Sequence, residues 1–281
     1  MGKVVRDLYY RKAKEVGFRA RSAFKLLQLD EEFGLFRNVQ KAVDLCAAPG
    51  SWSQVLATRL YPDGAFTDDK GGERERVIAV DLQEMAPIPG VRQLQGDITS
   101  QATADTIIGH FEGQRVDLVV CDGAPDVTGL HDMDEFLQAQ LIFGALAITT
   151  HVLASGGKFV AKVFRGRDLT LLAAQLRLFF ESITVAKPAS SRVNSSECFV
   201  VCEGFQGPIP AHGYIPEMVT PTLGQGSRDQ AAQTEKDVQR DEEEDSGKDR
   251  ALNIAVRCYV EQGDLSGFPM PGIPADVSKD R

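Results

Sequence analysis

Short apolar runs alternate with helical stretches along most of this chain, and this alternation limits its fold more than any other feature. Runs such as VDLVVCD and KFVAKVF are nearly continuous in apolar residues, as is typical of strands buried on both faces of a parallel sheet. Stretches such as SWSQVLATRL have the spacing of amphipathic helices. The sequence predicts strands over 41–46, 76–81, 91–95, 116–122, 158–165, 182–187 and 197–205. It predicts helices over 6–16, 20–33, 51–60, 100 to about 110 and 132–154. It also predicts a helix that has Asp168 as its cap and runs to about residue 181.

These elements indicate an α/β fold with a mostly parallel, seven-stranded sheet and helices on both faces. We expect the chain to have three parts. Residues 1–34 form basic N-terminal helices, called the front of the chain below, and residues 35–215 form the α/β core. Residues 216–281 form an acidic, largely disordered linker and a C-terminal docking tail, because the pattern of buried elements stops there.

Charge is unevenly distributed over the chain. The 281 residues carry a net charge of −9, yet residues 1–25 contain eight basic and two acidic side chains. Arg19 and Arg21 belong to this front. A basic front on an acidic chain allows a local contact with nucleic acid, although short basic helices are often only solvated surfaces.

Cysteine and histidine usage argues against a metal site. The five cysteines form no C-x-x-C motif, and none of the four histidines lies near them in sequence, so we expect free thiols, a reducing compartment and no metal. The amino terminus lacks the apolar run of a signal peptide, and no stretch reaches the roughly 18 apolar residues of a membrane span. We therefore expect a soluble intracellular protein that does not contact membranes.

The stretch AVDLCAAPGSWSQVL runs from a strand through a Pro-Gly corner into a helix. In open α/β sheets, ligands bind beyond the carboxyl ends of the strands, where such corners lie. Gly50 lets the backbone of this corner approach a ligand closely, because it has no Cβ. Three acids follow other strands or near-strands at the same edge: Asp81, Asp97 and Asp122.

These acids predict the kind of ligand. Asp81 can accept two hydrogen bonds from a ribose diol, and Asp97 can accept one from an exocyclic amine. The chain has neither the Gly-rich dinucleotide fingerprint nor a P-loop, so it makes little provision for phosphate. S-adenosylmethionine, which carries a sulfonium and no phosphate, fits this site better than NAD does. Each acid taken alone could also be an ordinary strand-end cap.

Lys162 lies inside the apolar strand KFVAKVF, where burying an ammonium group is expensive unless a partner compensates. Asp122 ends a neighbouring strand and could be that partner, and Glu197 opens another strand on the same side. Lys25 lies on the basic helix before the core. The alternative is that Lys162 belongs to an exposed edge strand.

With these residues, the chain resembles the FtsJ/RrmJ family of RNA ribose 2′-O-methyltransferases, in particular the branch that acts on the tRNA anticodon loop. The resemblance rests on RDLYYRKAKEVGFRARSAFKLLQLDEEF, AVDLCAAPGSWSQVL, VIAVDLQEM, LQGDIT, VVCDGAPDVTGLHDMDEF, GGKFVAKVFRG and SSECFVVC. The family's Lys-Asp-Lys-Glu tetrad falls on Lys25, Asp122, Lys162 and Glu197. Its S-adenosylmethionine positions fall on Gly50, Trp52, Asp81, Asp97 and Asp122.

This resemblance implies a Rossmann-like methyltransferase fold, in which residues 1–34 face the RNA, and a cytoplasmic enzyme with roles in tRNA processing and translation. The implied reaction is S-adenosylmethionine-dependent methylation of the riboses of tRNA nucleotides 32 and 34, with Lys162 as the base or oxyanion stabiliser. It also implies separate specificity partners, a WD-repeat protein for nucleotide 34 and an armadillo-like helical-repeat protein for nucleotide 32. Two alternatives stay open: methylation of ribosomal RNA, and a catalytically silent RNA-binding subunit.

Overall fold

The computed structural model describes residues 2–66, 76–124, 131–165, 169–192, 194–207 and 255–258. Its helices are α1 (Gly2–Val16), α2 (Ala23–Phe33), α3 (Ser51–Leu60), α4 (Gln101–His110), α5 (His131–Val152) and α6 (Leu169–Leu176). Its strands are β1 (Ala42–Leu45), β2 (Val77–Asp81), β3 (Val91–Gln95), β4 (Val116–Cys121), β5 (Leu153–Phe164), β6 (Phe180–Lys187), β7 (Glu197–Phe205) and β8 (Ala255–Cys258).

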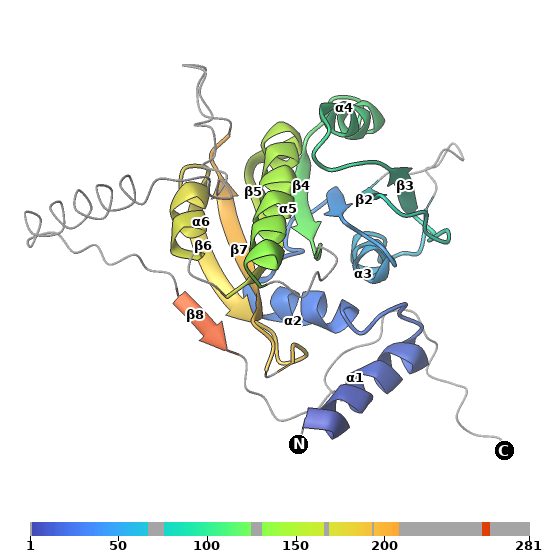
Figure 1. Ribbon diagram of the computed structural model, residues 1–281. Coiled ribbons are helices and arrows are strands. Elements are labelled where there is room, and N and C mark those ends of the chain that lie inside the picture. Colours follow the sequence, from blue (N-terminus) through green and yellow to red (C-terminus); the bar gives the residue numbers. More distant parts are fainter. Residues whose placement is uncertain are drawn as a thin grey trace, which may run out of the picture.

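The strands form one sheet in the order β3-β2-β1-β4-β5-β7-β6-β8 (Figure 1). Strands β1 to β5 pair in parallel, whereas β7 runs antiparallel to both β5 and β6. The predicted mostly parallel sheet of seven strands is therefore confirmed. An eighth short strand, β8, pairs in parallel with β6 at the edge and comes from the C-terminal region.

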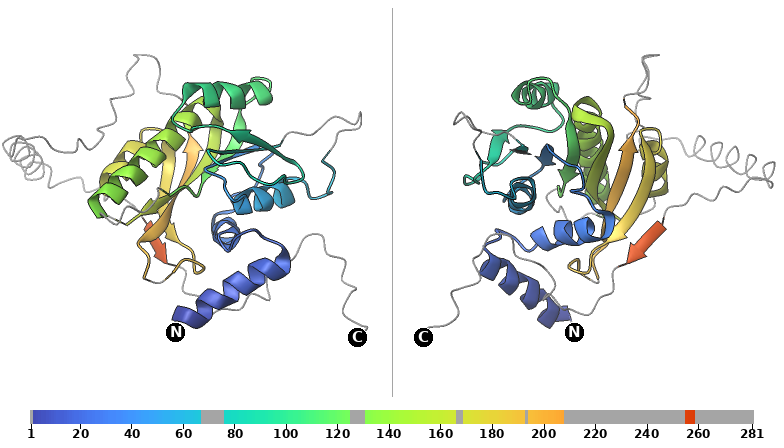
Figure 2. Two further views of the ribbon diagram at one scale, coloured as in Figure 1. Left: turned by 45° about the vertical axis from the view of Figure 1, so that its right-hand side comes forward. Right: turned by 180° about the vertical axis from the view of Figure 1, so that it is seen from behind.

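Helices cover both faces of the sheet, as the near-continuous apolar strands predict. Alternate residues of each strand point to opposite faces, and two separate apolar clusters result. Helices α4, α5 and α6 pack on one face, around residues such as Ile107, Leu146 and Leu176. Helices α2 and α3 pack on the other face, around Leu26 and Leu56. Figure 1 shows α5 in front of the sheet, and the view from behind in Figure 2 shows α2 and α3 in front of it.

Three predicted boundaries are wrong by four residues or more. Helix α1 begins at Gly2 instead of residue 6, and β5 begins at Leu153 instead of residue 158, so that α5 ends at Val152. The helix expected to reach about residue 181 ends at Leu176, and the next strand begins at Phe180. Aromatic packing explains this last difference, because the Phe180 ring lies 6.1 Å from Phe159 and 5.4 Å from Phe205, its neighbours in the sheet. Periodicity alone cannot separate a short apolar strand from the end of a helix. The predicted cap Asp168 lies outside the described residues.

The two front helices are joined to the core by aromatic contacts. Phe24 on α2 packs against Tyr9 on α1 and against Phe18 in the connection between the helices, with ring centroids 5.5 and 5.9 Å apart. Lys25, the next residue on α2, is thereby placed between the front of the molecule and the carboxyl ends of the strands, where it is buried.

Candidate active site

The Pro-Gly corner joins β1 to α3 through two unusual backbone conformations. Cys46 and Gly50 both have positive φ angles, of 56° and 98°. A Cβ on Gly50 would lie 2.7 Å from Ile88 Cδ1 and 2.9 Å from Arg19 Nη1. Only glycine combines this backbone angle with so close an approach to neighbouring side chains. The predicted close approach of Gly50 to a ligand stays a prediction.

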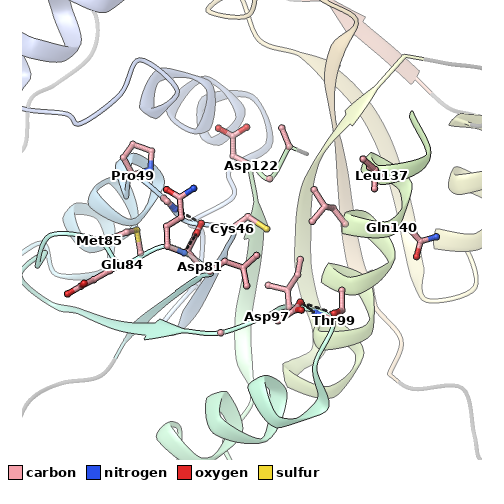
Figure 3. A pocket seen from close by; sticks show the side chains of 18 of the residues that line it. Cys46, Pro49, Asp81, Glu84, Met85, Asp97, Thr99, Asp122, Leu137 and Gln140 are labelled. Carbon is pink, nitrogen blue, oxygen red and sulfur yellow. Dashed lines mark hydrogen bonds between the residues drawn. The ribbon is translucent and has the colours of Figure 1, made fainter. Parts of the chain in front are cut away.

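A cavity of about 960 Å³ opens beside this corner, at the carboxyl ends of the parallel strands (Figure 3). Three predicted site residues line it: Asp81 at the end of β2, Asp97 after β3 and Asp122 after β4. Leu137 and Leu141 of α5 form part of the opposite wall. A ligand in this cavity would meet carboxylates on one side and apolar side chains on the other.

Two of the carboxylates are held by backbone N–H groups. Asp81 Oδ2 accepts from the Ala48 N–H at 2.8 Å, and Oδ1 accepts from the Gln83 N–H at 2.8 Å, so Asp81 links the corner to the loop after β2. Asp97 Oδ1 accepts from the N–H and the hydroxyl of Thr99, and these bonds lower the pKa of Asp97 below its ordinary value. Both side chains are fixed before any ligand binds.

The other two predicted cofactor residues do not line the cavity. Gly50 shapes the corner behind it. The Trp52 side chain is only 1% exposed; its Nε1 donates to the Ser22 carbonyl at 2.8 Å, and its ring packs 5.7 Å from that of Phe199. A contact between Trp52 and the cofactor therefore stays a prediction. Because the side chain is buried, only the main chain of Trp52 is available for such a contact.

Several residues that line the cavity were not predicted from the sequence. Glu84 and Met85 lie in the loop after β2, and loops of this kind give no periodic signal. Arg19 was assigned to the RNA-facing front, yet it lines the cavity and donates to the Pro49 carbonyl at 3.0 Å and the Pro87 carbonyl at 2.9 Å. It joins the corner to the loop after β2, a role that only the folded chain reveals.

The four residues of the expected tetrad lie together beside the cavity. Lys25 Nζ donates to Glu197 Oε2 at 2.7 Å. Lys162 Nζ donates to the Asp122 carbonyl at 2.7 Å and lies 3.2 Å from Asp122 Oδ1. Lys162 is buried, and its amine is directed at the end of β4 rather than at solvent beyond the sheet.

Strand register explains why these side chains meet. Lys162 pairs with Phe199, and Phe164 pairs with Glu197, in the antiparallel ladder of β5 and β7. Paired residues share a face, as do residues two apart on one strand, so Lys162 and Glu197 lie on the same face of the sheet. Helix α2 covers this face and brings Lys25 to 5.6 Å from the Phe199 ring centroid.

Burial and charge act in opposite directions on the two acids of the tetrad. Burial raises the pKa of Asp122, although the charges of Lys25 and Lys162 oppose the shift. Burial would also raise the pKa of Glu197, but the charge of Lys25 and the hydrogen bonds from Lys25 and Ser191 outweigh it, so that pKa is lowered. Glu197 is therefore held as a carboxylate beside Lys25.

A further acid, Asp44, lies in β1 and is completely buried. It accepts from the Ser53 hydroxyl at 2.6 Å. Burial raises the pKa of Asp44 to about 7, and the charges of Asp122 and Asp81 add to the shift. The folded state therefore binds the Asp44 proton more tightly than the unfolded chain does.

This proton predicts a pH-dependent effect of Asp44→Asn on stability. The stability that protonated Asp44 contributes is fully present below the ordinary pKa of 3.8 and is lost as the pH rises through about 7. The amide cannot ionise, so the variant should gain stability relative to the parent chain between pH 5 and pH 8, by roughly 3 kcal/mol, because the parent loses about 1.4 kcal/mol per pH unit from pH 5 to about 7. Urea unfolding of both proteins at the two pH values measures this gain; an equal difference at both pH values would contradict the assignment.

The described residues contain no group of three or more His, Cys, Asp or Glu side chains able to hold a metal ion. None of the helices in the described ranges is long and apolar enough to span a membrane.

The sheet order, with antiparallel β7 beside β5, and the cavity at the carboxyl ends of the parallel strands define a Rossmann-like methyltransferase fold. Comparison with known proteins then identifies the family. Residues 18–205 match the model of the FtsJ-like methyltransferases, and the chain belongs to this family. The family resemblance seen in the sequence is confirmed.

Two relatives carry more specific names. A protein of Mus musculus is 62% identical over 218 residues, and the match covers 78% of this chain and 64% of the mouse protein. A protein of Schizosaccharomyces pombe is 56% identical, and the match covers 77% of this chain and 74% of the yeast protein. Both are named tRNA (cytidine(32)/guanosine(34)-2′-O)-methyltransferase. The chain thus matches less than two thirds of the length of the mouse relative.

A solved structure supports the fold. The crystal structure described as that of a ribosomal RNA methyltransferase from Plasmodium falciparum superimposes with a TM-score of 0.57. The match covers 68% of this chain and all of the other chain, at 24% sequence identity.

Proposed function

We propose that this chain methylates the 2′-hydroxyl of riboses in the tRNA anticodon loop, at nucleotides 32 and 34, using S-adenosylmethionine. The family supports methyl transfer, and the names of the mouse and fission yeast relatives support the tRNA positions. One observation carries the chemistry: the amine of Lys162 is held at Asp122, and Asp122 also lines the cavity.

The cavity fits S-adenosylmethionine in its charge. Its described lining contains four carboxylates, of Asp81, Glu84, Asp97 and Asp122, and one basic side chain, that of Arg19. Asp122 Oδ1 is buried and forms an ion pair with Lys162 at 3.2 Å, but it accepts no regular hydrogen bond among the described residues. An excess of carboxylates suits a cationic ligand without phosphates. Asp81 would hold the ribose hydroxyls, Asp97 would accept from the adenine amine, and Asp122 would face the methionine end.

Bound S-adenosylmethionine would supply a methyl group attached to a positively charged sulfur. Lys162 would hold the ribose 2′-oxygen in line with that methyl carbon, at about 3 Å. Its amine would take up the hydroxyl proton, or stabilise the negative charge that develops on the oxygen. Lys25 and Glu197 would keep the pocket around the sugar preorganised, since each satisfies the other's charge at 2.7 Å.

The remaining parts of the proposal concern substrate and partner recognition. Residues 1–34 would face the tRNA, and the enzyme would act in the cytoplasm. We also propose a WD-repeat protein as the partner for nucleotide 34 and an armadillo-like helical-repeat protein as the partner for nucleotide 32. Such partners would supply the surface that reads the rest of the tRNA, because the front helices offer only a small basic area.

Methyl transfer to defined tRNA transcripts tests the proposal. The full chain, alone and with each candidate partner, is incubated with radiolabelled S-adenosylmethionine and a transcript that has ribose throughout. We expect this transcript to be labelled, and we expect no labelling of a transcript with 2′-deoxyribose at nucleotides 32 and 34. Equal labelling of both transcripts would refute the proposed positions.

The same assay separates the two alternatives. Labelling of ribosomal RNA in preference to tRNA would favour the ribosomal function. Cofactor and tRNA binding without any turnover, in the presence of both partners, would favour a silent RNA-binding subunit. We expect neither result.

A further inference from the structure

A closed ring of hydrogen bonds begins and ends on helix α2, next to the proposed active site. Lys25 and Gln28 are three residues apart on α2 and therefore share a face. Lys25 donates to one oxygen of Glu197 at 2.7 Å, and the Ser191 hydroxyl donates to the other at 2.8 Å. Gln28 Oε1 closes the ring by accepting from the N–H and the hydroxyl of Ser190, at 2.9 and 2.8 Å.

Ser190 is the part of this ring that the protein holds most firmly. It is completely buried, in the loop between β6 and β7. Its N–H and hydroxyl both donate to Gln28, and its carbonyl accepts from the Arg21 guanidinium. All the polar groups of Ser190 are therefore satisfied from α2 and the turn before it. Ser191, which follows directly, therefore donates to Glu197 from a loop that Gln28 anchors.

We propose that Gln28 is a positioning residue for methyl transfer, because it fixes the β6–β7 loop and so keeps the Glu197 carboxylate directed at Lys25. This inference rests on the proposed function, in which that pair preorganises the ribose site. Removing the Gln28 amide would leave two buried donors of Ser190 without their acceptor, and the loop would shift to find another. A shift of about 1 Å at catalytic side chains is enough to slow a reaction strongly.

Gln28 also links the ring of hydrogen bonds to helix α1. Its Nε2 donates to the Tyr9 hydroxyl of α1 at 3.3 Å. Every polar atom of the Gln28 side chain therefore has a partner, and these partners lie on two separate segments. Contacts that tRNA makes with α1 would reach Glu197 through this side chain.

Two substitutions at Gln28 separate positioning from simple packing. Gln28→Met keeps the length of the side chain but removes its acceptor; we expect kcat on tRNA to fall by about 10-fold or more and the KM for S-adenosylmethionine to stay unchanged. Gln28→Glu keeps an acceptor for both Ser190 donors, and we expect it to retain kcat within about threefold of the parent. Thermal melts of both variants check the fold.

Ser191→Ala provides a second test of the positioning role, which can be made even if Gln28→Met fails to fold. It removes only the bond to Glu197, and it should lower kcat with the KM for S-adenosylmethionine unchanged. The double variant that carries both Gln28→Met and Ser191→Ala should have the same kcat as the less active of the two single variants. The effects should not add, because both substitutions act on one ring. Gln114→Met is the matched control: this amide accepts from Lys41, outside the ring, and the change should leave kcat unaffected.

The inference is overturned if Gln28→Met and Ser191→Ala both keep the parent kcat, or if Gln28→Glu is as impaired as Gln28→Met. An inactive parent chain gives a different result. Absence of methylation by the parent, with tRNA and both partners present, would refute the proposed function itself.

Discussion

Replacing Lys162 with methionine is expected to reduce methyl transfer about a thousandfold while leaving S-adenosylmethionine binding nearly unchanged. Methionine keeps most of the buried aliphatic stem and removes the amine that lies 2.7 Å from the Asp122 carbonyl. The fold should tolerate the change, because the raised pKa of Asp122 lets that carboxyl take up a proton when its partner is lost. Single-turnover methylation and equilibrium cofactor binding measure the two quantities separately.

Lys158→Met is the matched control on the same strand. Lys158 is also a lysine of β5, but its Nζ donates to the carbonyls of Gly34 and Leu35 at 2.7 and 3.1 Å, away from the tetrad. Its removal should lower stability and leave the rate of transfer unchanged. Substantial activity of Lys162→Met, or an equal loss in both variants, would contradict the role assigned to Lys162.

Replacing Asp81 with asparagine is expected to weaken S-adenosylmethionine binding by about 100-fold. Each carboxylate oxygen of Asp81 accepts one backbone N–H, from Ala48 and from Gln83, and both keep capacity for the ribose hydroxyls. Asparagine has only one acceptor oxygen, so it loses a backbone bond and a charge-assisted ligand bond together, at about 1.5–3 kcal/mol for each charged bond. Isothermal titration with S-adenosylmethionine measures the change.

Asp117→Asn is the control for removing the charge of a carboxylate that backbone N–H groups hold. Asp117 Oδ2 accepts from two backbone N–H groups, those of Gln40 and Lys41, at the amino end of β4. Asparagine can keep both bonds with its single acceptor oxygen, so this variant should bind the cofactor as the parent does. If Asp81→Asn binds S-adenosylmethionine as tightly as Asp117→Asn, Asp81 does not hold the ribose.

Much of the fold could be predicted because the signals are local. Most strands of the core contain a short apolar run, and each predicted run becomes a strand, although β5 begins five residues before its predicted start of 158. The error at Leu176–Phe180 arose where an apolar helix passes directly into an apolar strand. No residue there breaks the pattern, and the strand is specified by aromatic contacts with distant strands.

The cavity could be predicted in part for the same reason. Asp81, Asp97 and Asp122 end strands or near-strands, and the ends of parallel strands meet at one edge of the sheet. Arg19 and Trp52 could not be placed from sequence, since their positions depend on how α2 and α3 pack. The ring through Gln28 and Ser190 likewise joins residues 162 positions apart, which a single sequence cannot reveal.

Site-resolved mapping of ribose methylation in tRNA tests the central claim most directly. Cells that lack this chain are complemented with either the parent chain or Lys162→Met, and their tRNA is mapped at nucleotides 32 and 34. We predict that methylation at both nucleotides is lost without the chain, returns with the parent and stays absent with the variant. Full methylation at both nucleotides in cells complemented with Lys162→Met would contradict the claim that this lysine performs the reaction.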